Sequence, residues 1–67
     1  MKNLLAPDSA ATFLAISPKT LEAMRIRGNG PAWVKVSARR VAYRVEDLEA
    51  YVKSRTFSST SEYGRLN

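Results

Sequence analysis

Basic side chains gathered in the middle of this sequence are its clearest candidates for binding a partner. Between residues 19 and 44 lie 7 of the 11 lysines and arginines, and Glu22 is the only acidic residue there. The seven are Lys19, Arg25, Arg27, Lys35, Arg39, Arg40 and Arg44. Positive charge gathered in the middle of a short chain favours a polyanionic partner, with nucleic acid the first candidate. Solvated charge that only keeps the protein soluble is the alternative.

No group of residues is suited to catalysis or to metal binding. The sequence has no cysteine and no histidine, so zinc lacks its two commonest ligands. The carboxylates of Glu46, Asp47 and Glu49 are expected at the start of a helix, where the helix dipole favours negative charge. The GNG segment at 28–30 precedes a predicted hairpin, whereas a phosphate-binding loop leads from a strand into a helix. We therefore expect no enzymatic activity and no cofactor.

The first basic residues lie in SPKTLEAMRIRG, residues 17–28, which is predicted to be a helix. Ser17 is a favourable N-cap, and Pro18 suits the first helical turn. Gly28 can adopt the left-handed conformation that ends a helix. A helix with such definite ends can hold its side chains at fixed positions for a partner.

The side of this helix opposite Leu21 is predicted to contact that partner. At about 100° per residue, Met24 falls beside Leu21 on the buried side. The opposite side carries Lys19, Ala23 and Ile26, flanked by Glu22 and Arg27. A helix in the major groove of DNA uses small residues for close approach and methyl-bearing residues against thymine. The alternative is that Ile26 packs under the hairpin that follows.

Side-chain chemistry assigns roles along this helix. Lys19 and Arg27 could reach base edges or phosphates, and Glu22 could accept from a cytosine amino group or hold an arginine. Thr20, near the helix start, is expected to touch a phosphate or to complete the cap. Arg25 falls toward the side of the helix, where a phosphate contact and a salt bridge are equally plausible.

A β-hairpin is predicted after the helix. Strand-forming residues flank the segment SARR at 37–40, namely Trp33, Val34, Val36, Val41 and Tyr43. Alternation places Val34 and Val36 on one face. The hairpin would bring four basic residues to the DNA backbone or to a minor groove, where arginine is favoured: Lys35, Arg39, Arg40 and Arg44.

Helices are predicted on both sides of these elements. Residues 6–15 form the first, with a core face of Pro7, Ala10, Ala11 and Leu14, and only Ala15 and Ile16 separate it from the next. Such a short link favours a steep crossing, as in a helix-turn-helix. Residues 45–55 form the last helix, with a buried stripe of Leu48, Tyr51 and Val52. We expect one domain over 1–55 and a flexible Ser/Thr-rich tail over 56–67.

Three segments, in this order and spacing, resemble a known family. They are AATFLAISPKTL (10–21), GNGPAWVKV (28–36) and YRVEDLEAYV (43–52). The chain is similar to the small excisionase-like, AlpA-type proteins allied to the MerR DNA-binding domain. The resemblance implies an α+β winged helix-turn-helix fold of three short helices, with a two-stranded hairpin wing between the second and third.

The resemblance also implies which residues bind double-stranded DNA. The second helix would enter the major groove and the wing would lie on the flanking backbone or in the minor groove. The helix positions are Ser17, Lys19, Thr20, Glu22, Ala23, Arg25, Ile26 and Arg27, and the wing positions are Lys35, Arg39, Arg40 and Arg44. The sequence departs from the family pattern at Ala6, Ala15 and Met24, and at Glu22 and Ala23, which replace residues that are frequently basic.

Proteins that look like this one act as excisionases of phages, plasmids or integrative elements, binding and bending attachment-site DNA beside an integrase. Others regulate transcription. The small size implies side-by-side self-association on repeated sites, and aromatic residues in the tail suit contact with an integrase.

Two other classes of function compete with DNA binding. The first is an adaptor that docks an integrase or polymerase through Ile26 and the tail (Phe57, Tyr63, Leu66) without touching DNA. A salt titration would separate it from DNA binding. The second, RNA binding, is less favoured because Trp33 is the only aromatic residue near the basic surface.

The predicted location is the cytoplasm, on the bacterial nucleoid. The longest apolar runs are too short to span a membrane, and residues 1–15 lack the features of a signal peptide. We therefore expect no membrane partner.

Overall fold

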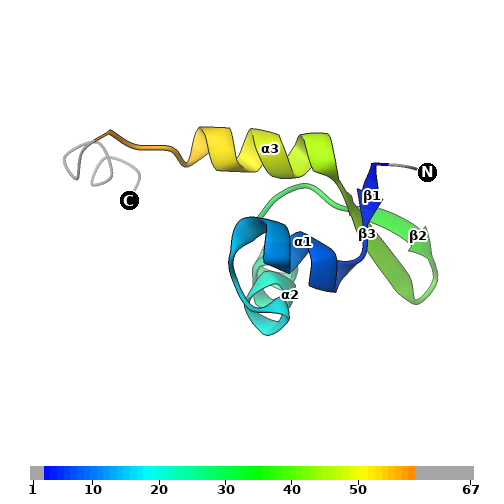
Figure 1. Ribbon diagram of the computed structural model, residues 1–67. Helices are drawn as coiled ribbons and strands as arrows, with labels where there is room; N and C mark the ends of the chain where they lie inside the picture. The colour runs from blue at the N-terminus through cyan, green and yellow to red at the C-terminus, as the bar shows by residue number, and fades with distance from the viewer. Residues whose placement is uncertain (1–2, 59–67) are drawn as a thin grey trace.

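Three helices and three short strands form residues 3–58, the part of the chain that this computed structural model describes (Figure 1). In chain order the elements are β1 (Leu4–Leu5), α1 (Pro7–Leu14), α2 (Pro18–Arg27), β2 (Val34–Ser37), β3 (Arg40–Arg44) and α3 (Val45–Ser54). This order confirms the α+β winged helix-turn-helix architecture, with the hairpin between α2 and α3. None of the described helices is long and apolar enough to cross a membrane.

Both predicted ends of α2 are confirmed. The Oγ of Ser17 accepts a hydrogen bond from the backbone N–H of Thr20 at 3.1 Å, and Pro18 occupies the first turn. Ser17 Oγ also donates to Thr20 Oγ1 at 2.8 Å, so the Thr20 hydroxyl completes the cap. At the other end Gly28 has φ +77°, a left-handed conformation that glycine adopts without strain. Local chemistry therefore fixes α2 at both ends.

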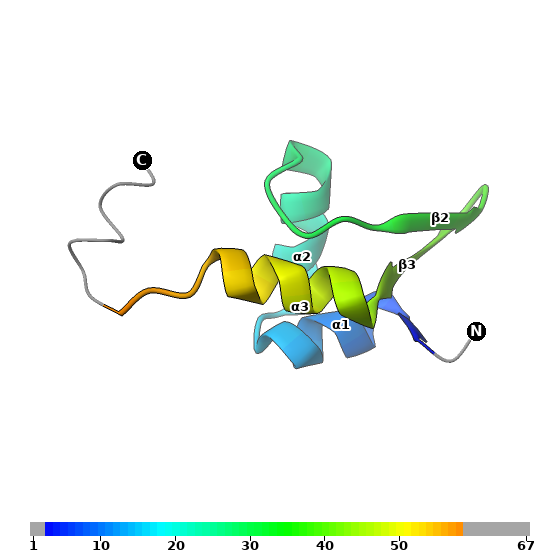
Figure 2. The same ribbon diagram turned by 90° about the horizontal axis from the view of Figure 1, so that it is seen from above.

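The chain changes direction between α1 and α2 at Ala15. This residue has φ 60° and ψ 37°, the only positive φ at a non-glycine position among the described residues. The N–H of Ala15 donates to Thr12 O and that of Ile16 to Ala11 O, each at 3.0 Å, which caps the end of α1. The left-handed turn sends α2 across α1 at a steep angle, as Figure 2 shows.

The core is built around α1, which contacts α2, α3, β1 and β3. Ala10 and Ala11 are fully buried on α1, and their small side chains allow the other elements to approach closely. The other members of the core cluster are Leu21, Tyr43 and Leu48, with Leu5, Leu14 and Ile16 packed against them. The predicted core positions Ala10, Ala11, Leu14, Leu21 and Leu48 are therefore confirmed.

The sheet has a third strand that the sequence did not predict. Its order is β1-β3-β2, both pairings are antiparallel, and β1 places Leu4 opposite Arg44 and Leu5 opposite Tyr43. The carbonyl of Asn3 also accepts a hydrogen bond from the N–H of Val45 at 2.9 Å. A strand of two residues has no detectable alternation, so only the fold reveals it. It anchors the base of the hairpin and leaves the tip free to project.

One predicted core position is wrong, and one strand residue departs from the predicted alternation. Val36 is 54% exposed whereas Val34, predicted on the same face, is half-buried, because the register shifts between Lys35 and Ser37. Val52 is 45% exposed, because the last turns of α3 reach past the end of α1 (Figures 1 and 2). Most of the predicted flexible tail, including Tyr63 and Leu66, lies outside the described residues.

Candidate nucleic-acid interface

A hollow of about 610 Å³ lies between α2 and the hairpin. The two elements project on the same side of α1 (Figure 2), and the amino end of α1 also lines the hollow. The lining residues are Ala6, Pro7 and Asp8 before and in α1, Pro18, Lys19, Glu22 and Arg25 in α2, and Arg39, Arg40 and Val41 at the hairpin tip. The fold thus brings the predicted recognition helix and the predicted wing to one concave surface.

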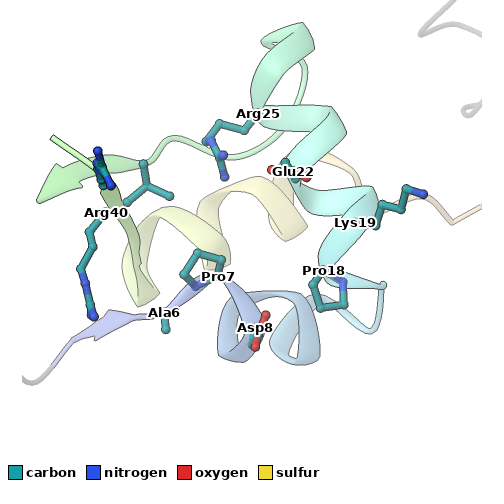
Figure 3. A pocket seen from close by; sticks show the side chains of 10 residues that line it. Ala6, Pro7, Asp8, Pro18, Lys19, Glu22, Arg25 and Arg40 are labelled. Atoms are coloured by element: carbon teal, nitrogen blue, oxygen red, sulfur yellow. The ribbon is translucent and has the colours of Figure 1, made fainter. Parts of the chain in front are cut away.

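Cations outnumber anions in this hollow. Its charged residues are Lys19, Arg25, Arg39 and Arg40 against Asp8 and Glu22. Figure 3 shows Arg25 pointing from α2 toward the hairpin side, with Arg40 on β3 across the hollow. Like charges held together on a concave surface favour an anionic ligand that covers both walls.

The part of α2 that lines the hollow lies next to the side whose centre was predicted at Ala23 and Ile26. The hollow is lined by Pro18, Glu22 and Arg25, with Lys19 at its edge and directed away from the hairpin (Figure 3). Ile26 does not line it and is 76% exposed, so the alternative that Ile26 packs under the hairpin is wrong. The helix therefore presents two adjoining stripes, one toward the hollow and one toward solvent.

Arg25 lies against an aromatic ring. Its guanidinium carbon lies 5.8 Å from the centroid of the Trp33 ring, within the range of a cation–π contact. The sequence had left a salt bridge as one alternative for Arg25. This salt bridge is absent, because the one ion pair found within residues 3–58 joins Arg44 and Asp47. Trp33 lies in the loop before β2, so only the fold could reveal this contact.

Arg44, predicted to be a wing residue, is occupied elsewhere. Its Nε donates to Asp47 Oδ2 at 2.7 Å and its Nη2 to Asp47 Oδ1 at 3.1 Å. These hydrogen bonds and the negative charges of Asp47 and Glu46 raise the pKa of Arg44. The residue lies opposite Leu4 at the base of the hairpin and does not line the hollow. Through its two hydrogen bonds to Asp47, Arg44 stabilises the first turn of α3.

The remaining candidates lie around the hollow. Lys35 is exposed on β2 opposite Val41, and Arg27 is exposed in the last turn of α2. Ala23 is half-buried, and its small side chain does not project from α2 beside Ile26. Ser17 and Thr20 are exposed, but their hydroxyls bond to each other in the cap. Within residues 3–58 no cluster of acidic residues could hold a metal ion.

The amino end of α1 is a part of the site that sequence reasoning missed. Pro7 and Asp8 line the hollow, although the sequence predicts Pro7 on the core face of this helix and does not include Asp8 among the site residues. Asp8 stabilises the first turn through the helix dipole and at the same time adds an anion to a basic surface. No local pattern could have indicated that this helix start faces the hairpin tip.

Comparison with known proteins agrees with this geometry. A model of a helix-turn-helix domain matches residues 4–56, a span that includes α1, α2, the sheet and α3. A search of curated proteins gave no match to the chain. The matched span contains every residue that lines the hollow. The chain therefore belongs to the helix-turn-helix domain family HTH_17, the AlpA- and excisionase-like family, and is a DNA-binding helix-turn-helix protein.

Proposed function

We propose that this protein binds duplex DNA with α2 in the major groove and the hairpin tip on the adjacent backbone, and that it does so as an excisionase. The hollow between α2 and the hairpin, with cations on both walls, is the observation that carries this proposal. A phosphate strand that crosses the hollow would meet Arg25 on one wall and Arg39 and Arg40 on the other, with Lys19 at the edge for a neighbouring phosphate. Such a clamp fixes the register of α2 on the duplex.

The dimensions of α2 suit this arrangement. Its 10 residues span about 15 Å, and the major groove is about 12 Å wide, so one end of the helix can enter while the other stays near the hairpin. Glu22 repels phosphate, but its carboxylate can accept from the amino group of cytosine. We therefore assign Glu22 to base edges and the four cations of the hollow to phosphates or base acceptors.

Excision is favoured over other tasks by membership of the AlpA- and excisionase-like family. In this role the protein would act without catalysis or a cofactor of its own, on the nucleoid in the bacterial cytoplasm. It would bind side by side on repeated sites and bend the DNA for an integrase. Transcription regulation is the second candidate, because the same surface would serve a lone promoter operator.

A salt titration tests the DNA-binding part of this proposal. Four phosphate contacts predict a slope of about −3.6 for log affinity against log salt concentration. A slope near zero would contradict it and would favour an adaptor that docks a protein through the exposed Ile26.

Footprinting and a bending assay test the role in excision. Protection of tandem sites beside an integrase core, together with a bend in the protected DNA, is the expected result. Protection of a single promoter operator without a bend would favour transcription regulation instead.

A further inference from the structure

Trp33 is a large aromatic residue with no assigned role in the proposed DNA binding. It is 44% exposed, although a ring of this size is normally buried more deeply unless it has a partner. It lies in the loop that leads from α2 into β2, and one face of its ring is covered by the guanidinium of Arg25 at 5.8 Å. The contact links the helix to the segment that begins the hairpin.

The loop is held against α2 by a close approach of backbone to side chain. A β-carbon placed on Gly30 would come within 2.9 Å of Met24 Cβ, so glycine is required for this approach. The resulting second hollow, of about 320 Å³, is lined by Met24, Arg25, Gly28, Gly30, Pro31, Ala32 and Trp33. Arg25 lines this hollow and the larger one, so its side chain stands on the ridge between them.

The way in which Arg25 is held leaves its hydrogen-bonding groups available. A cation–π contact attracts a guanidinium through its charge and takes up none of its N–H donors in a hydrogen bond to a protein acceptor. Among the side-chain hydrogen bonds and ion pairs within residues 3–58, none joins the Arg25 guanidinium to a protein acceptor. Arg44 shows the opposite case, since Asp47 occupies two of its donors.

From these contacts we infer that Trp33 is a positioning residue for DNA recognition. It holds the Arg25 guanidinium at the edge of the basic hollow with its donors free for a pair of acceptors on DNA. A guanine edge, through O6 and N7, and a phosphate both offer such a pair. Because the side chain is ordered before binding, less rotamer freedom is lost when the contact forms. This role of Trp33 rests on the proposed function.

A double-mutant cycle tests this role. The probes are a short labelled duplex selected by the wild-type protein from a random pool and a scrambled duplex. Trp33→Leu keeps apolar volume but removes the aromatic face, and we expect it to weaken binding about three- to tenfold. Trp33→Phe keeps an aromatic face and should restore most of the affinity. With Arg25→Ala present, Trp33→Leu should have no further effect, because the positioned group is gone.

A control and a second measurement keep the role of Trp33 separate from folding. Tyr51→Leu removes the other cation–π contact, that of Arg55 at 6.0 Å on α3, and should leave the affinity unchanged. In the DNA-free protein, ring current from Trp33 should shift the Nε–H resonance of Arg25, and Trp33→Phe should reduce this shift. Equal losses from Trp33→Leu with and without Arg25 would overturn the inference while leaving DNA binding intact. A wild-type protein that fails to bind either duplex would instead refute the proposed function.

Arg25→Lys distinguishes the two sources of acceptors, because lysine keeps the charge but loses the planar fork. Loss of preference for the selected duplex indicates a guanine edge, and equal weakening on both duplexes indicates a phosphate. Affinity equal to the wild type on both would contradict a paired contact.

Discussion

Ala15→Gly should stabilise the protein, because Ala15 is held in the left-handed conformation at φ 60°. An L-residue with a β-carbon loses about 1–2 kcal/mol in that conformation relative to glycine. Glycine gives back about 0.4–1 kcal/mol through the greater freedom of the unfolded chain. The expected net gain is therefore about 0.5–1 kcal/mol in the free energy of unfolding. For a domain of this size the gain corresponds to a rise in Tm of about 2–8 °C.

Thermal and urea unfolding followed by circular dichroism measure this gain. Ala50→Gly is the matched control, because Ala50 is exposed within α3 and the same change there should cost about 1 kcal/mol. The two substitutions should therefore shift Tm in opposite directions. If Ala15→Gly destabilises the protein as much as Ala50→Gly does, the turn between α1 and α2 is not left-handed. A left-handed turn could then not explain the steep crossing of the two helices.

Three further predictions concern the core and the wing. Tyr43→Phe should leave the free energy of unfolding unchanged or raise it by about 1 kcal/mol, since the buried hydroxyl has no hydrogen-bond partner among the described residues; urea unfolding checks this, and a clear loss of stability would show a hidden partner. Leu48→Ala should cost about 2–5 kcal/mol and leave much of the protein unfolded at 25 °C, because Leu48 is fully buried; cooperative unfolding near the wild-type Tm would contradict this. Arg40→Ala should weaken binding to selected and scrambled DNA alike and lower the magnitude of the salt slope by about 1, as expected for a phosphate contact; loss on the selected duplex alone would make it a base contact.

Elements with local signals could be predicted from the sequence. Ser17, Pro18 and Gly28 set the ends of α2 through chemistry within a few residues, and the structure confirms all three. The helical spacing of apolar residues likewise indicated the core face of α1, which contains Ala10 and Ala11. Interactions within one helical turn depend little on the rest of the fold, so a sequence reports them well.

Features that depend on distant segments escaped prediction. The strand β1 exists only because β3 lies beside it, and the register shift near Val36 depends on the geometry of the hairpin. For the candidate site, helical periodicity indicated a reading face of α2 with Ala23 and Ile26 at its centre, but it could not indicate that Glu22 and Arg25 line a hollow shared with the hairpin. The contact of Arg25 with Trp33 and the position of Asp8 in the hollow arise from packing between elements.

A DNA interface at this hollow is best tested by titrating the isotope-labelled protein with duplex DNA and following its backbone amide resonances. The largest shifts are expected in α2 and at the hairpin tip, around Lys19, Arg25 and Arg40, which line the hollow. Little change is expected in α3, none of whose residues lines the hollow. Shifts concentrated in α3, with α2 and the hairpin unchanged, would contradict a DNA interface at this hollow.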